Sequence, residues 1–298
     1  VSAAYFVNGD SARFDAAGAA NPSVSLVEVV QPGSVTVDAA TDYTLSGIGN
    51  IGGAGGLTKT NGGKLTINTT NAYTGVTTLG GGVLEVPSLA GAGFSSPIGA
   101  ASASPANLVF EGGTLRYTGG SVSTDRGATL GTSGGTIEVT DSAATLTVSG
   151  TMAGGGALAK TGPGTLTLTA ANEYTNGTVI SDGVLRVNTA TSAGSGGITN
   201  NGATFRLATT TTIPNIMEFT GNCTLDLNNT GGNQALDGAW SGSGTVNFIN
   251  QQSTTVRTFT MGGNGSGGGH MDNFTGVINI GTNNGFFRFN DGGGTYNF

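Results

Sequence analysis

Residues 55–86 read GGLTKTNGGKLTINTTNAYTGVTTLGGGVLEV, and residues 156–187 read GALAKTGPGTLTLTAANEYTNGTVISDGVLRV. The two stretches align without a gap at the shift that separates Lys59 from Lys160, which is 101 residues. About half of the aligned positions are identical, including Asn71 with Asn172 and Tyr73 with Tyr174. Repetition at a fixed period indicates an array of equivalent structural units.

Two weaker correspondences extend the repeat. Residues 272–289 (DNFTGVINIGTNNGFFRF) form a degenerate third copy, with Phe274 in the place of the repeated tyrosine. Residues 113–117 (GTLRY) correspond to residues 203–207 (ATFRL), but at a shift of 90. The first interval therefore holds about eleven extra residues. We expect them in a loop over residues 87–107, which is rich in Pro, Ala, Ser and Gly, and we predict another loop excursion over residues 261–271.

Hydrophobic and polar residues alternate within each unit. Leu65-Thr66-Ile67 and Leu166-Thr167-Leu168 are two examples of this period of two. The alternation predicts short strands with one buried face, so Leu166 should face the core while Thr165 and Thr167 face solvent. Glycine pairs before many of these strands indicate tight corners. No segment has the pattern of an amphipathic helix.

Two all-β architectures suit short strands separated by glycine turns, a sandwich and a coiled β-helix. A sandwich gives no reason to reproduce a long string at a fixed shift, whereas a solenoid stacks equivalent coils. We therefore predict one parallel β-solenoid over residues 1–298. About twelve to fourteen coils of roughly 20–25 residues, stacked ~4.8 Å apart, would give a rod on the order of 60 Å long. Equivalent residues of successive copies are expected at the same edge of the rod.

The composition limits the partners of such a rod. Glycine supplies 56 of the 298 residues, charged residues are only 9%, and the net charge is −7. The ten Lys and Arg residues are spread thinly, which argues against a nucleic-acid partner. No apolar run is long enough to span a bilayer. The single cysteine, Cys223, is expected to be a small buried hydrophobic residue. A first residue of Val1 instead of Met suggests a processed or excised start.

The repeated pattern resembles a known family. G-x-L-x-K-T-x-x-G-x-L-T, followed by N-x-Y-T and G-V-L-x-V, is similar to the autotransporter-associated β-strand repeat of bacterial surface proteins. The segment 112–139 and the opening residues 8–14 also look like parts of such proteins. The resemblance implies a right-handed parallel β-helix outside a bacterial envelope, and it implies no particular chemistry.

Few residue combinations could carry catalysis. Polysaccharide-cleaving β-helices use clustered carboxylates, but the 17 acidic residues here are scattered. Asp125-Arg126 is the best adjacent acid–base pair, and we expect it to be solvated or to fix a turn. His270 with Asp272 nearby is a poor metal site, because a structural site needs more ligands. We predict no catalytic residue, no metal and no cofactor.

Two other groups of residues need an explanation. The repeated Lys59 and Lys160 are expected to serve packing or solubility. The aromatic residues near the C-terminus suit either a capping mini-core or a docking surface; they are Phe286, Phe287, Phe289, Tyr296 and Phe298.

These observations favour an extracellular structural protein, either an adhesin stalk or a self-associating subunit of a surface filament. The alternative is a β-helix that binds or degrades polysaccharide, and cell-surface glycans stay open as partners. An uncapped solenoid exposes strand edges and an apolar column at each end. Val1–Val7 and Phe286–Phe298 are therefore expected to associate end to end, or to be covered by flanking coils of a longer surface protein.

Overall fold

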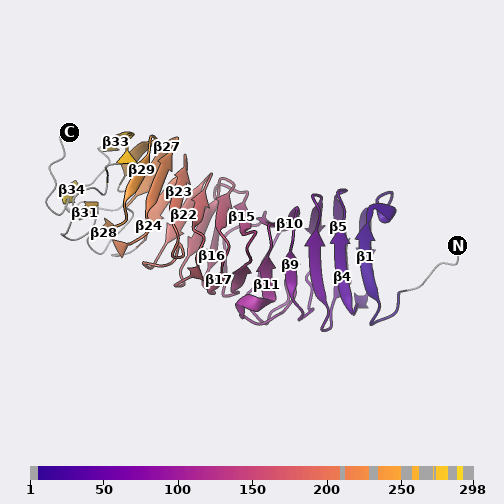
Figure 1. Cartoon of the computed structure of the whole chain (residues 1–298). Helices are drawn as coiled ribbons and strands as arrows, with labels where there is room; N and C mark the ends of the chain where they lie inside the picture. Colours follow the sequence, from indigo (N-terminus) through magenta and orange to yellow (C-terminus); the bar gives the residue numbers. More distant parts are fainter. Residues whose placement is uncertain are drawn as a thin grey trace.

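The chain forms an elongated stack of parallel strands in the computed structural model (Figure 1). The structure describes residues 6–208, 212–227, 234–249, 257–261, 271, 273–280 and 287–290. Three strand positions follow one another around each coil, and each strand pairs with the strands at the same position in the neighbouring coils. This confirms the predicted parallel β-solenoid.

Two sheets begin near the N-terminal end. The first sheet contains, in spatial order, β1 (Ser11–Asp15), β4 (Ser34–Asp38), β7 (Gly56–Thr60), β9 (Thr77–Leu79), β11 (Leu108–Phe110), β14 (Ala128–Leu130), β17 (Met152–Gly154) and β20 (Glu173–Tyr174). The long sheet contains β2 (Ser23–Leu26), β5 (Tyr43–Gly47), β8 (Lys64–Ile67), β10 (Val83–Val86), β12 (Thr114–Tyr117), β15 (Gly135–Val139), β18 (Leu158–Thr161), β21 (Thr178–Ile180), β23 (Ile198–Asn201), β26 (Met217–Thr220), β29 (Trp240–Gly242) and β32 (Asn273–Phe274).

Three further sheets complete the coils. The late sheet contains β13 (Val122–Thr124), β16 (Thr145–Val148), β19 (Thr165–Leu168), β22 (Val184–Val187), β24 (Thr204–Leu207), β27 (Asn222–Asp226), β30 (Thr245–Ile249) and β33 (Val277–Ile280). In the early coils its place is taken by the pair β3 (Val29–Val30) and β6 (Asn50–Ile51). After β20 the place of the first sheet is taken by β25 (Thr212–Ile213), β28 (Gln234–Leu236), β31 (Arg257–Met261) and β34 (Phe287–Asn290).

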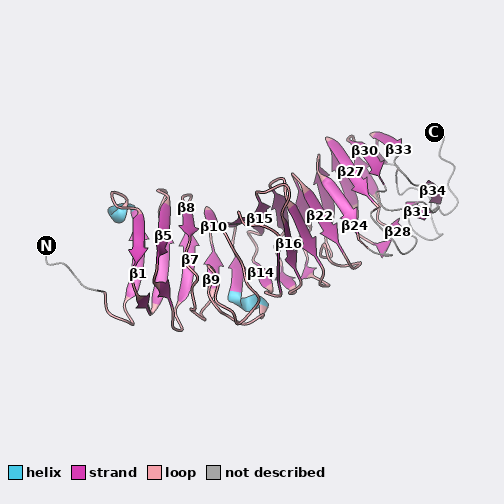
Figure 2. Cartoon of the chain, turned by 180° about the vertical axis from the view of Figure 1, so that it is seen from behind, coloured by secondary structure: helices cyan, strands magenta, loops and turns pink. Residues whose placement is uncertain are grey.

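Helix is almost absent from the described chain (Figure 2). Two short 3-10 turns occur, η1 (Ala16–Gly18) and η2 (Pro105–Asn107). No helix among the described residues is long and apolar enough to cross a membrane. Most backbone N–H and C=O groups therefore form their hydrogen bonds between strands of neighbouring coils and not within helices.

The inward-facing residues form one continuous apolar column. Leu166 is fully buried in β19, and it pairs in register with Leu146 below and Leu185 above. Burial of each such side chain contributes about 1.5–3 kcal/mol. In the late coils the column becomes aromatic, because the Trp240 ring lies 4.8 Å from that of Phe219 and 6.1 Å from that of Phe274. The alternation in the sequence thus identifies the core correctly.

One outward position differs from the expectation. The alternation predicts that Thr167 faces solvent, but it is only 2% exposed and its hydroxyl has no hydrogen-bond partner within the described part of the chain. Its neighbours in register are Thr147 and Arg186, one coil away on each side. Alternation identifies the face of the strand, whereas exposure also depends on the length of the side chains in the neighbouring coils, and the long Arg186 adjoins Thr167.

The predicted placement of the repeat copies at one edge is wrong. Lys59 lies on β7 of the first sheet, whereas Lys160 lies on β18 of the long sheet. The coil that contains Lys59 contributes β8 to the long sheet, and β18 lies four coils further along that sheet. One period of the sequence repeat therefore advances the chain by four coils and one additional face. The third copy advances again, because Tyr174 is on β20 of the first sheet and Phe274 on β32 of the long sheet. The two lysines nevertheless make equivalent hydrogen bonds on the two faces.

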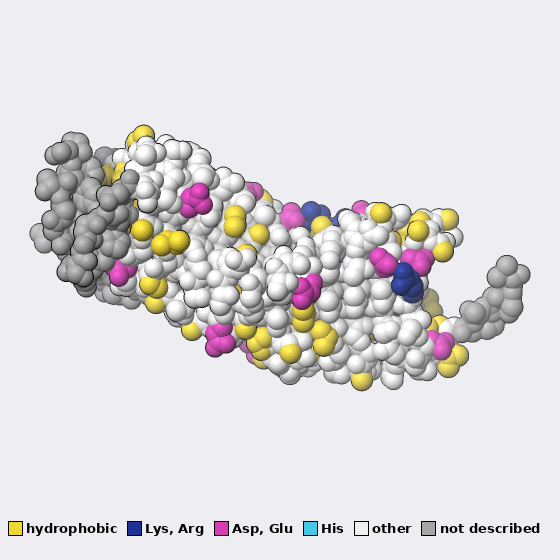
Figure 3. Space-filling model, in the orientation of Figure 1, with side chains coloured by type: hydrophobic (Ala, Val, Ile, Leu, Met, Phe, Trp, Pro, Cys, Tyr) yellow, Lys and Arg dark blue, Asp and Glu magenta, His cyan; other side chains and the backbone are white. Residues whose placement is uncertain are grey.

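The outer surface has few charged groups (Figure 3). Four of them form a ladder of alternating sign, in which Glu85 bridges Lys64 at 3.1 Å and Arg116 at 3.4 Å, and Arg116 also contacts Glu138 at 2.7 Å. Alternating signs avoid repulsion between paired strands. Arg186 and Arg206 are an exception, because these like charges pair directly in register.

Candidate functional site

The repeated lysines are buried at the corners of the solenoid. Both Lys59 and Lys160 are 0% exposed. The Lys160 ammonium donates hydrogen bonds to the carbonyl oxygens of Thr161 at 2.8 Å, Gly162 at 2.6 Å and Asp182 at 3.1 Å. Lys59 makes the equivalent three bonds to Thr60, Asn61 and Gly81. Of the two expected roles, packing is therefore the one that the structure shows, and neither lysine can contact a ligand.

The repeated asparagine and tyrosine also point inward. Tyr73 and Tyr174 are buried, and their hydroxyls lie 2.8 Å and 2.6 Å from the hydroxyls of Thr77 and Thr178. Burial raises the pKa of both tyrosines. The Asn71 and Asn172 carboxamides each accept a hydrogen bond from a backbone amide of the preceding coil, those of Ile51 and Met152. The family-like motif therefore specifies corners of the coil, and its polar residues are structural.

Replacing Lys160 with Met is expected to remove a pH dependence of stability. Burial lowers the pKa of Lys160 from 10.5 to about 8, so the unfolded chain binds this proton more tightly than the folded chain. The unfolding free energy of the wild type should therefore rise as the pH increases from about 8 to about 10 and fall as the pH decreases through about 8. Lys160→Met should abolish Lys160's contribution to the rise and cost about 2 kcal/mol at pH 7, because three carbonyls lose their donor.

Chemical denaturation at several pH values in this range measures the effect. The matched control is Lys64→Met, which removes a lysine that is 32% exposed and should leave the rise intact. Lys59 gives a smaller remaining rise of the same sign, because burial lowers its pKa as well. An unchanged pH dependence in Lys160→Met would show that this lysine is hydrated in solution.

The Asp125-Arg126 pair fixes a loop. Arg126 is 5% exposed. Its guanidinium donates hydrogen bonds of 2.8–3.3 Å to five backbone carbonyls, which belong to Ala90, Gly91, Phe94, Gly99 and Ala101. Asp125 accepts a hydrogen bond from the amide of Ala92 at 2.6 Å. Turn fixing is thus the correct interpretation of this pair, and it acts on the stretch 87–107, which contains η2 and no strand.

The structure shows where the eleven extra residues lie. The side-chain amide of Asn71 donates a hydrogen bond to the carbonyl of Pro97, and the side-chain amide of Asn172 donates one to the carbonyl of Ser192. Pro97 and Ser192 are therefore equivalent at a shift of 95 residues. Six of the extra residues therefore precede Pro97, and five follow it. The segment around Pro97 is common to both copies. The part before it, which we call the tip segment (residues 88–95), holds the six extra residues, because only residues 188–190 occupy the place of residues 87–95 in the second copy.

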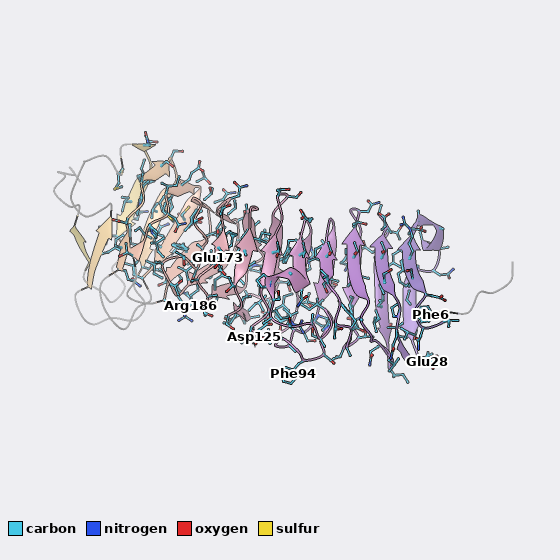
Figure 4. All side chains as sticks on the ribbon, turned by 60° about the horizontal axis from the view of Figure 1, so that its bottom comes forward. Phe6, Glu28, Phe94, Asp125, Glu173 and Arg186 are labelled. Carbon is cyan, nitrogen blue, oxygen red and sulfur yellow. The ribbon has the colours of Figure 1, made fainter. Side chains whose placement is uncertain are left out.

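The tip segment presents an aromatic residue to solvent. Phe94 is 71% exposed, and it lies at the edge of the rod in Figure 4, on the same side as Asp125. Its backbone is held by a turn, because the Phe94 amide donates to Gly91 and Gly93 adopts a φ of 78° that favours glycine. The loop and the Asp-Arg pair are both visible in the sequence, but their connection is not, since no local pattern shows which carbonyls an arginine will reach.

The other predicted candidates bring no chemistry together. Cys223 is buried, with its thiol 3.1 Å from the carbonyl oxygens of both Asn200 and Thr220, and burial raises its pKa. No three His, Cys, Asp or Glu side chains of the described chain are close enough to hold a metal ion. Several predicted positions lie outside the described residues; they are Val1–Tyr5, His270, Asp272, Phe286, Tyr296 and Phe298.

Comparisons with known proteins agree with this picture. A family model described as the passenger-associated-transport-repeat matches residues 57–86 and 158–187, which confirms the resemblance seen in the sequence. The chain is 38% identical over 243 residues to the "Adhesin BmaC autotransporter" of Brucella suis biovar 1 (strain 1330). This match covers 80% of the chain but only 6% of that protein. No solved structure matches the chain.

Proposed function

The chain belongs to the family of proteins that carry the passenger-associated-transport-repeat, and we propose that it is a rigid, non-catalytic segment of a bacterial surface adhesin. The observation that carries this proposal is the internal position of the repeated Lys, Asn and Tyr side chains. Because the side chains of the motif are buried at the corners of the coil, the motif stabilises a long rod and leaves the outer surface free to vary. The adhesin name of the similar Brucella protein supports a location outside the cell.

Two forms of this function differ in what adjoins the rod, a stalk within a longer chain or a filament of subunits joined end to end. The N-terminal end supports both. A cavity of about 210 Å³ opens there, lined by apolar side chains that include Phe14, Val24 and Leu26. Phe6, which also lines the cavity, is 43% exposed. A further coil stacked on β1 and β2 would cover this apolar surface and pair the strand edges that have no partner among the described residues.

Beads coated with the purified chain test the proposal. We expect them to adhere to monolayers of cultured epithelial cells more strongly than beads coated with an unfolded variant of the chain. Light scattering on the same preparation distinguishes the two forms, because monomeric rods support the stalk and lengthening oligomers support the filament. Adhesion no greater than that of the unfolded control would contradict the adhesin function. Release of sugars from polysaccharides by the pure chain would favour the alternative, a polysaccharide-degrading β-helix.

A further inference from the structure

We propose that the tip segment is a binding site for a neutral sugar, formed by the ring of Phe94, the carboxylate of Asp125 and the bare backbone of Gly91. This inference rests on the proposed adhesin function and names the chemistry of its ligand. The second copy of the repeat has a connection six residues shorter at this place, so the solenoid can be built without the insertion in the tip segment. What it adds to the rod is an ordered apolar group in solvent.

The tip segment is anchored by the buried side chain of Arg126. Three of the five carbonyls that Arg126 contacts belong to it, those of Ala90, Gly91 and Phe94. The remaining two, of Gly99 and Ala101, belong to the stretch after Pro97. One buried guanidinium therefore connects the inserted residues to the part of the corner that both copies share. Such an anchor reduces the conformational entropy that a binding loop loses when it takes up a ligand.

Two different kinds of contact converge above Gly91. A methyl group placed on this glycine would lie 3.2 Å from Oδ1 of Asp125 and 3.8 Å from Cδ2 of Phe94, so the carboxylate and the ring edge border the same space. Oδ1 of Asp125 also accepts a hydrogen bond from the Ala92 amide, which fixes the position of the carboxylate. A methyl group there would crowd Oδ1, so glycine leaves the backbone bare between the carboxylate and the ring.

The chemistry of the site favours a neutral sugar. An exposed aromatic face can stack on the C–H groups of a pyranose ring, and a fixed carboxylate can accept hydrogen bonds from its hydroxyls. An acidic glycan would be repelled by Asp125 and by the net charge of −7. An apolar protein pocket would have to desolvate the same carboxylate, which is costly without a charged partner. Neutral glycans combine an apolar face and hydroxyl donors without either cost.

The experiment compares the wild type with Phe94→Ala, Asp125→Asn and a control variant, Ile48→Ala. Ile48 is an exposed apolar residue of the early coils, 94% exposed and remote from the tip segment. Binding is measured on an array of immobilised neutral and acidic glycans, and bead adhesion to epithelial cells is measured in parallel. We expect binding to neutral glycans that weakens about tenfold in Phe94→Ala. It should also weaken in Asp125→Asn, which keeps the acceptor for the Ala92 amide, and it should be unchanged in Ile48→Ala.

Treatment of the cells separates the sugar ligand from the adhesin function. Loss of wild-type adhesion after periodate oxidation of the cell surface supports the sugar ligand. Adhesion that survives oxidation but is lost after protease treatment would leave the adhesin function intact and overturn the sugar site. So would glycan binding that is equal in the wild type and Phe94→Ala, or that is confined to acidic glycans. Absence of both glycan binding and adhesion would overturn the two proposals together.

Discussion

Leu166→Asp is expected to unfold the central coils of the rod. The side chain is fully buried between Leu146 and Leu185, so the substitution places an unpaired carboxylate in the apolar column. Burial of an unpaired charge costs several kcal/mol, and each coil is stabilised mainly by its neighbours. We expect a large fall in the urea midpoint and the thermal midpoint, followed by circular dichroism, with rapid proteolysis in the central coils.

The control variant for Leu166→Asp is chosen by the exposure of the side chain in the structure, and not by the alternation of the sequence alone. Thr167 is the adjacent outward position, but it is buried beside Arg186 and would report a mixture of desolvation and ion pairing. Thr147 occupies the same register one coil earlier and is half-buried. Thr147→Asp should change stability by less than about 1 kcal/mol, as is usual for a surface substitution. Equal losses in Leu166→Asp and Thr147→Asp would mean that the assignment of the inner face is wrong.

Arg126→Met is expected to release the loop over residues 87–107 while the rod stays folded. The substitution keeps most of the aliphatic stem but removes the donor from five buried or half-buried carbonyls. Each unsatisfied group costs about 1–3 kcal/mol, so we expect a loss of at least 3 kcal/mol in the local opening free energy of the loop. Hydrogen–deuterium exchange should therefore become faster by two orders of magnitude or more for the Gly93 and Gly99 amides.

Two further variants show whether the guanidinium geometry is responsible. Burial lowers the pKa of the native Arg126. Arg126→Lys keeps a charged group, but the lysine ammonium can donate to at most three of the five carbonyls. It should give intermediate exchange. Arg13→Met removes an exposed arginine that contacts Asp15 and Asp38, and it should leave exchange in the loop unchanged. Slow exchange that persists in Arg126→Met would show that other contacts hold the loop.

Local patterns in the sequence determine most of the fold. The period of two around Leu65, Leu84 and Leu166 predicts strands with one buried side, and the structure buries all three leucines. Alternation is sufficient because side chains of a strand point to opposite faces whatever the strand pairs with. The constant shift between Lys59 and Lys160 predicts a solenoid, because only stacked equivalent units explain a long repeated string.

The tertiary structure alone decides where these units lie. The face that each copy occupies depends on the summed length of four coils and their loops, so it cannot be inferred from one motif. Lys59 and Lys160 accordingly lie on different faces. The buried position of Lys160 depends on carbonyls that only the folded corner assembles. Arg126 reaches carbonyls 25 to 36 residues away in the chain, and Asp125 meets Phe94 across Gly91 only when the coils are stacked. The sequence by itself thus determines the repeating coil, whereas the candidate binding surface arises where residues of different coils meet, because contacts across such distances depend on the whole path of the chain between them.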